Sequence, residues 1–151
     1  IKIVVKSLLD SEEKVQLIVV AGVNKKLIRW LKKIHCPSNK KMRIYEYTNN
    51  IEELMTVATL IVTKPGGITT TEALAKNLPM VIINPIPGQE VYNTNFLLKS
   101  GVAIRIDKVK HLGDEMTQLL QSPERMAKMR QAAKDNSHPT SAIDIARLIL
   151  Q

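Results

Sequence analysis

Residues 59–77 read TLIVTKPGGITTTEALAKN, and this stretch decides the fold. Its first five residues, with apolar residues at 60–62, are typical of a buried strand, and residues 68–77 favour a helix. Two glycines, Gly66 and Gly67, lie between the two segments. In parallel sheets, ligands bind outside the carboxyl ends of the strands. We therefore expect a strand, a glycine turn and a helix, with a ligand site at the turn.

Strands and helices alternate on both sides of this unit. The near-continuous apolar run at 15–21 predicts a parallel strand buried on both faces. Further strands are predicted at 42–45, 80–83 and 102–106, and further helices at 24–33, 51–57, 89–99, 109–120, 123–134 and 141–150. This alternation indicates an α/β fold, a doubly wound Rossmann-like parallel sheet.

The beginning of the chain departs from that pattern. Apolar residues recur at helical spacing, which predicts an amphipathic helix at Ile1, Val4, Val5, Leu8 and Leu9. Doubly wound nucleotide-binding domains normally begin with a strand and a glycine-rich turn. We therefore expect residues 1–151 to form one domain that lacks its first strand, as a fragment of a larger enzyme.

The charge of the chain is positive and unevenly spread. Its 22 Lys and Arg residues outnumber 14 Asp and Glu, giving a formal charge of +8. Residues 15–45 contain no acidic residue but hold Lys25, Lys26, Arg29, Lys32, Lys33, Lys40, Lys41 and Arg43. Such a block favours either an anionic membrane surface or an ordinary solvated helix face. With 3% aromatic residues, a stacking platform for single-stranded nucleic acid is excluded.

The cellular compartment is indicated by two features that the sequence lacks, a pair of cysteines and a long apolar run. Cys36 is the only cysteine, so an internal disulfide is excluded, as suits a reducing cytosol. No apolar run approaches the roughly 20 residues of a membrane-spanning helix. We expect a cytoplasmic protein.

The glycine turn has the chemistry of an anion site. Paired glycines let the backbone approach a phosphate, and a helix start offers unpaired N–H groups at the positive end of its dipole. Thr69 to Thr71 add hydroxyl groups, and Lys64 adds a cation. Glu72 has two interpretations. It forms a capping box with Thr69, or its carboxylate accepts from the hydroxyls of a ribose.

A second loop, residues 84–93, reads NPIPGQEVYN and follows the next predicted strand. The amide of Gln89 beside the carboxylate of Glu90 supplies donors and acceptors suited to sugar hydroxyls, although an ordinary proline-rich loop has the same pattern. The sequence has no P-loop, no G-x-G-x-x-G and no zinc-type spacing of cysteine and histidine, so we expect no metal site.

Together, KPGGITTTEAL at 64–74 and NPIPGQEVYNTNFLLKSG at 84–101 closely resemble the C-terminal domain of a GT-B glycosyltransferase family. That family contains the processive diacylglycerol glucosyltransferases, the monogalactosyldiacylglycerol synthases of plants and the N-acetylglucosaminyltransferase of peptidoglycan synthesis. The resemblance covers residues 1–150 and is strongest over 50–101. The form NPIPGQE is similar to the diacylglycerol branch.

The resemblance implies a role for each matching position. It implies that the diphosphate of UDP is bound by Lys64, Gly66, Gly67, Ile68 and Thr69. It places Glu72 on the ribose and assigns the donor sugar to Gln89, Glu90 and Asn93. Weaker matches on the donor side are Gly22, Asn24 and Thr48.

The activity that the resemblance implies is transfer of a hexose, glucose or galactose, from a UDP-sugar to a diacylglycerol-type membrane lipid. No cofactor is required, and the enzyme is peripheral on the inner face of the cell membrane. The general base lies in an N-terminal domain that has no counterpart here, so no catalytic residue is assigned and residues 1–151 alone are expected to be inactive. The alternatives are a non-catalytic nucleotide-binding module and a UDP-sugar epimerase, with nucleic-acid binding ranked last. The oligomeric state is left open.

Overall fold

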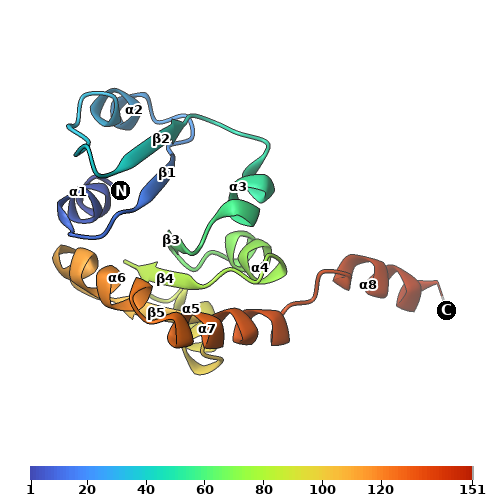
Figure 1. Ribbon diagram of the computed structural model, residues 1–151. Helices are drawn as coiled ribbons and strands as arrows, with labels where there is room; N and C mark the ends of the chain where they lie inside the picture. Colours follow the sequence, from blue (N-terminus) through green and yellow to red (C-terminus); the bar gives the residue numbers. More distant parts are fainter. Residues whose placement is uncertain (151) are drawn as a thin grey trace. The chain divides into compact units, whose positions relative to one another are not determined.

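The computed structural model describes residues 1–150, which divide into two compact units (Figure 1). The first unit comprises Ile1–Leu54 and Lys108–Ser122. The second comprises Met55–Asp107 and the segment from Pro123 onward. Each unit contains its own parallel sheet, so the prediction of an α/β fold with parallel strands is confirmed. The assignment of residues 1–151 to one domain stays a prediction.

The first unit is built on a two-stranded parallel sheet. Its elements are α1 (Lys2–Asp10), β1 (Gln16–Val20), α2 (Lys25–Leu31), β2 (Lys41–Tyr45), the start of α3 (Ile51–Val57), the 3-10 turn η1 (Val109–His111) and α6 (Leu112–Leu120). The strands are in register with Leu17 opposite Met42 and Val19 opposite Ile44. The helix predicted at the start of the chain is therefore confirmed as α1.

The core of the first unit lies between α1, α2 and one face of β1. Its buried members are Val5, Leu9, Val19, Ala21, Leu27, Ile28 and Leu31. The prediction that β1 is buried on both faces is wrong. Leu17 and Val19 pack in this core, whereas Gln16 is exposed and Ile18 is 40% exposed. In a strand successive side chains point to opposite faces, and only one face of β1 is covered by α1 and α2.

The second unit is built on three parallel strands in the order β3-β4-β5. Its elements are the end of α3, β3 (Ile61–Thr63), α4 (Gly67–Ala75), β4 (Met80–Ile83), α5 (Val91–Lys99), β5 (Ala103–Ile106), α7 (Pro123–Asp135) and α8 (Ser141–Ile149). β4 is central and buried along its whole length, with Val81 opposite both Val62 and Ile104. Its continuous apolar sequence is what a central parallel strand requires.

Helices α1 and α6 approach closely in the first unit. The backbone N–H of Gly113 donates to Ser7 Oγ at 2.9 Å, although the two residues are 106 positions apart. A Cβ atom added at Gly113 would lie 2.7 Å from the carbonyl oxygen of Ser7. Because that atom belongs to the backbone of a helix, it cannot move without shifting α1. Glycine is therefore required here by packing.

We expect Gly113→Ala to lower the free energy of unfolding by about 1–3 kcal/mol, the usual cost of overpacking a close contact. Urea denaturation followed by circular dichroism measures this change. The matched control is Gln118→Ala, an exposed position on the same helix, which should change stability by less than about 0.5 kcal/mol. Equal stability of the two variants would contradict the close packing of α6 on α1.

Candidate functional site

Two glycine-bearing loops leave the second unit's sheet from the same edge. β3 and β4 are parallel, with Thr63 at the end of β3 paired with Ile82 near the end of β4. The loop after β3 leads into α4, and the loop after β4 leads into α5. This is the carboxyl edge, where parallel sheets bind ligands. The structure thus brings together the two stretches that the sequence analysis singled out.

Helix α4 begins without a side-chain cap. Gly66 is its N-cap residue, with an extended backbone (φ −66°, ψ 144°), and no side chain accepts from the first N–H groups. The N–H groups of the first helical turn have no partner within a helix, and they lie at the positive end of its dipole. The beginning of α4 therefore presents free donors at the edge of the sheet.

Neither glycine of this turn is required by the protein itself. A Cβ atom added at Gly66 or Gly67 would meet nothing within 4 Å. Neither residue has a positive φ, so a side chain would be tolerated by the backbone. Glycine also lacks the capping oxygen that Ser, Thr, Asn or Asp would provide. The paired glycines are best explained by something that approaches the backbone from outside.

Of the two interpretations of Glu72, the capping box with Thr69 is wrong. α4 starts at Gly67, so Thr69 already lies inside the helix and cannot be its N-cap residue. Thr71 Oγ1 donates back to the carbonyl of Ile68 at 2.9 Å. Thr70 is buried, and its hydroxyl has no hydrogen-bond partner among the described residues. The Glu72 carboxylate is partly exposed and forms no hydrogen bond or ion pair within residues 1–150, which leaves the ribose interpretation open.

The second loop is held by Glu90, the N-cap residue of α5. Glu90 is only 8% exposed, and its Oε2 accepts from the backbone N–H of Ile86 at 2.6 Å. Its own N–H donates to the carbonyl of Ile86 at 3.0 Å, so the loop is closed from both sides. Gly88 has φ +80°, a conformation that favours glycine. Gln89 is exposed at the outside of this turn.

A contact that the sequence did not predict joins the two loops. Asn93 Nδ2 donates to the carbonyl oxygen of Pro65 at 2.8 Å. Asn93 belongs to the first turn of α5, and Pro65 directly precedes the N-cap residue of α4. The two residues are 28 positions apart in the sequence. Because every residue type has a backbone carbonyl, the residue at the acceptor position does not reveal that a side chain donates to it.

The three weaker candidates lie in the first unit, where each has a local role. Asn24 Oδ1 accepts from the N–H of Leu27 at 3.0 Å, so Asn24 caps α2. Thr48 Oγ1 accepts from the N–H of Asn50 at 3.1 Å. Gly22 has φ +58°, so glycine is favoured there by the backbone. Their donor-side roles stay predictions.

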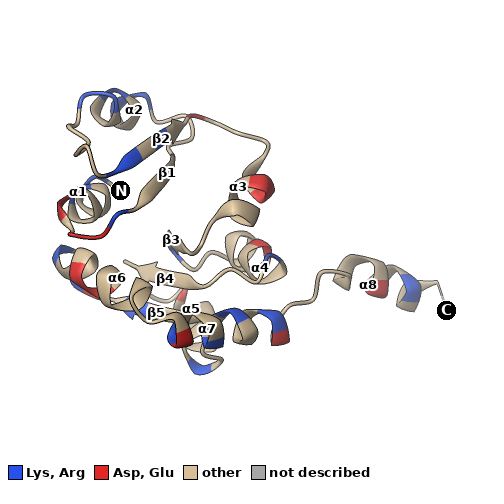
Figure 2. Cartoon of the chain, viewed as in Figure 1, with Lys and Arg blue, Asp and Glu red and all other residues tan. Residues whose placement is uncertain are grey.

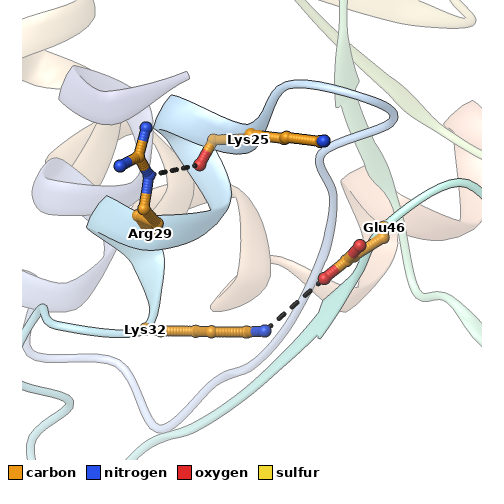
Figure 3. A network of polar contacts seen from close by, with 4 residues as sticks. All are labelled: Lys25, Arg29, Lys32 and Glu46. Carbon is orange, nitrogen blue, oxygen red and sulfur yellow. Dashed lines mark hydrogen bonds and ion pairs between the residues drawn. The ribbon is translucent and has the colours of Figure 1, made fainter.

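Part of the basic stretch forms an exposed face of α2, whereas Lys41 and Arg43 lie on β2. Leu27, Ile28 and Leu31 are buried, Trp30 is half-buried, and the remaining residues of the helix are exposed Lys or Arg (Figure 2). Lys32 pairs with Glu46 at 3.4 Å, where both side chains are 63% exposed, and Arg29 Nε donates to the carbonyl of Lys25 at 3.4 Å (Figure 3). An ion pair this exposed contributes at most about 1 kcal/mol.

Lys40 does not belong to that exposed face. It is 6% exposed, and its ammonium donates to the carbonyl oxygen of Ser11. Lys40 therefore has a structural role, although it belongs to the basic stretch of the sequence.

In the described part of the chain, residues 1–150, no His, Cys, Asp and Glu side chains gather in groups of three or more that could hold a metal. Within the same residues no helix has the length and apolar character to cross a membrane.

Comparison with known proteins agrees with this architecture. Residues 1–136 match the family described as "Glycosyl transferases group 1". The processive diacylglycerol beta-glucosyltransferase of Bacillus subtilis (strain 168) is 34% identical over 127 residues, which is 84% of this chain and 33% of that protein. The enzyme of the same name from Bacillus pumilus (strain SAFR-032) is 39% identical over equal shares of the two chains. The chain thus spans about a third of the length of these curated relatives.

A solved structure has the same fold. MurG of Acinetobacter baumannii superposes with a TM-score of 0.81 at 18% identity, covering 95% of this chain and 43% of that one. At this identity the likeness concerns the fold alone. The matched family, the two relatives and the parallel sheets agree with one another, and the chain belongs to the group 1 glycosyltransferases, with the α/β architecture of GT-B enzymes.

Proposed function

We propose that residues 64–69 bind the diphosphate of a UDP-sugar through the N-terminus of α4. The observation that carries this proposal is the pair Gly66 and Gly67, which begin an uncapped helix and are required by neither packing nor backbone conformation. Backbone N–H groups at a helix start suit an anion. Lys64 is exposed beside this turn and supplies a positive charge.

The ribose and the sugar follow from the neighbouring polar groups. The Glu72 carboxylate lies on the second turn of α4, and it is the acceptor that we assign to the ribose hydroxyls. The exposed amide of Gln89 is the group we assign to the hexose, glucose or galactose. Glu90 Oε2 and Asn93 Nδ2 already bond to the protein, so Glu90 Oε1 and the Oδ1 and second N–H of Asn93 remain for the sugar.

In the whole protein we propose transfer of the hexose to a diacylglycerol-type lipid. Support comes from the relatives named processive diacylglycerol beta-glucosyltransferase, of which this chain spans about a third. Negative charge that develops on the leaving UDP would be stabilised by the N–H groups of α4 and by Lys64, so the reaction needs no metal or other cofactor in this proposal. The base that activates the lipid hydroxyl lies outside residues 1–151, and these residues alone are expected to be inactive.

The exposed basic face of α2 supports a peripheral position on an anionic membrane at the cytoplasmic side. An acceptor in the bilayer makes surface attraction useful, because each basic residue near an anionic surface contributes about 1 kcal/mol. The face consists of the exposed residues Lys25, Lys26, Arg29 and Lys32 with the adjoining Lys33.

For the nucleotide site, Glu72→Gln removes one charge and keeps the size of the side chain. We expect the Kd for UDP, measured by calorimetry, to rise about tenfold or more, because hydrogen bonds to a charged group contribute about 1.5–3 kcal/mol. Against 2′-deoxy-UDP the same substitution should have a smaller effect, since one hydroxyl is missing. Glu115→Gln, an exposed carboxylate in the first unit, is the control. An equal loss for both nucleotides would contradict the ribose contact.

A test of the helix terminus is Gly66→Asp. The new carboxylate would cap α4, so the free energy of unfolding should stay the same or rise by up to about 1 kcal/mol. The same carboxylate would occupy the free N–H groups and repel a diphosphate, so we expect UDP affinity to fall more than about tenfold. Ala75→Asp adds equal charge at the other end of α4 and should leave UDP binding unchanged. Undiminished binding by Gly66→Asp would place the diphosphate elsewhere.

For the membrane, we compare two triple variants in sedimentation with phosphatidylglycerol-containing vesicles. Lys25→Gln/Lys26→Gln/Arg29→Gln neutralises the basic face of α2, and the partition coefficient should fall by about two orders of magnitude. Arg125→Gln/Lys128→Gln/Arg130→Gln removes the same charge from exposed positions of α7. An equal loss in both variants, or binding that does not depend on anionic lipid, would rule out a docking role for α2.

A further inference from the structure

We propose that Asn93 is a positioning residue that fixes the glycine loop of α4 relative to Gln89. The proposal rests on the proposed function in one respect, since it takes residues 64–69 to be the diphosphate site. The observation behind it is the hydrogen bond from Asn93 Nδ2 to Pro65 O at 2.8 Å.

The acceptor of this bond controls the orientation of the glycine turn. The carbonyl of Pro65 and the N–H of Gly66 belong to one peptide group, which is planar. Pro65 is fully buried, and the Gly66 N–H donates to Lys64 O at 2.9 Å. A bond that holds the Pro65 oxygen therefore also fixes the plane from which α4 begins.

Asn93, the donor of this bond, lies in a part of α5 that is held by further hydrogen bonds. Asn93 lies in the first turn of α5, between Glu90 and Thr94. Thr94 is 2% exposed, and its Oγ1 donates to the carbonyl of Glu90 at 2.8 Å. The Glu90 carboxylate in turn holds the N–H of Ile86. The start of α5 and the loop before it are thus tied together, and Asn93 transmits that order to the neighbouring loop.

The glycine turn needs such a bond because its own residues do not restrict it. Gly66 and Gly67 contact no other part of the protein through a side chain, and glycine has more conformational freedom than any other residue. If binding had to order this turn, the free energy spent on ordering would weaken the affinity of the ligand. A turn that is held in place before binding does not impose that cost. Positioning through Asn93 therefore affects every ligand that uses the α4 N-terminus, with or without a sugar.

The test uses Asn93→Asp and Asn93→Ala in the purified protein, with Asn95→Asp and Asn95→Ala as matched controls. Asn95 is exposed on the same helix and offers the same changes of charge and size. Asn93→Asp keeps an acceptor oxygen for a sugar hydroxyl but places a carboxylate against the Pro65 oxygen. Calorimetry gives the Kd of UDP and of UDP-glucose, and hydrogen exchange gives the protection of the amides of Gly66 to Thr70 without ligand. Circular dichroism verifies folding.

We expect both Asn93 variants to raise the two Kd values by a similar factor, about fivefold or more, and to speed amide exchange of residues 66–70 in the free protein. The Asn95 variants should change neither. A selective loss of UDP-glucose affinity with unchanged exchange would limit Asn93 to contact with the sugar and overturn the proposal, as would variants without effect on exchange. If wild-type protein bound no UDP, the proposed function would fail, while exchange at residues 66–70 would still decide whether Asn93 holds the turn.

Discussion

The parallel pairing of β3 with β4 is the constraint on which the second unit depends. Because the strands run in the same direction, the loops that follow Thr63 and Ile83 open on one edge of the sheet. The central strand β4 is buried throughout, whereas β3 is partly buried. An antiparallel arrangement would send the two loops to opposite edges, and Asn93 could not reach Pro65.

The two helix starts at this edge differ in how their backbone groups are bonded. The beginning of α4 offers N–H groups with little help from side chains, since its N-cap residue is a glycine and Thr71 bonds to its own helix. The beginning of α5 shows the opposite design, because Glu90 and Thr94 bind backbone groups around them. One helix start is thus open to a ligand, and the other is satisfied internally and serves as its support.

Much of the fold was predictable because it depends on local patterns. Continuous apolar residues mark β4, helical spacing marks α1, and Asn24 occupies the N-cap position that its side chain favours. Prediction failed where two patterns compete or where the partner is distant. Thr69 and Glu72 have capping-box spacing, yet the helix begins before them at Gly67. The exposure of Ile18 depends on which face of β1 is covered, which its own sequence does not encode.

The candidate site was predictable to a similar extent. Both loops were found from their glycines and from their places after strands. The internal role of the Glu90 carboxylate, and the bond from Asn93 to Pro65, were not predicted because both depend on loop geometry rather than on residue type. A polar side chain at a helix start looks the same in sequence whether it serves a ligand or its own backbone.

The contact between Gly113 and Ser7 has a consequence for biosynthesis. The first unit is discontinuous, because α6 comes from a segment that is separated from Ile1–Leu54 by the second unit's residues 55–107. During translation, which proceeds from the N-terminus, α1 leaves the ribosome long before α6 exists. The contact of α1 with α6 must wait for more than 100 residues of synthesis, an interval in which the nascent chain is open to chaperones and to association with other chains. The second unit is discontinuous as well, because its last segment begins at Pro123 and is therefore made after α6.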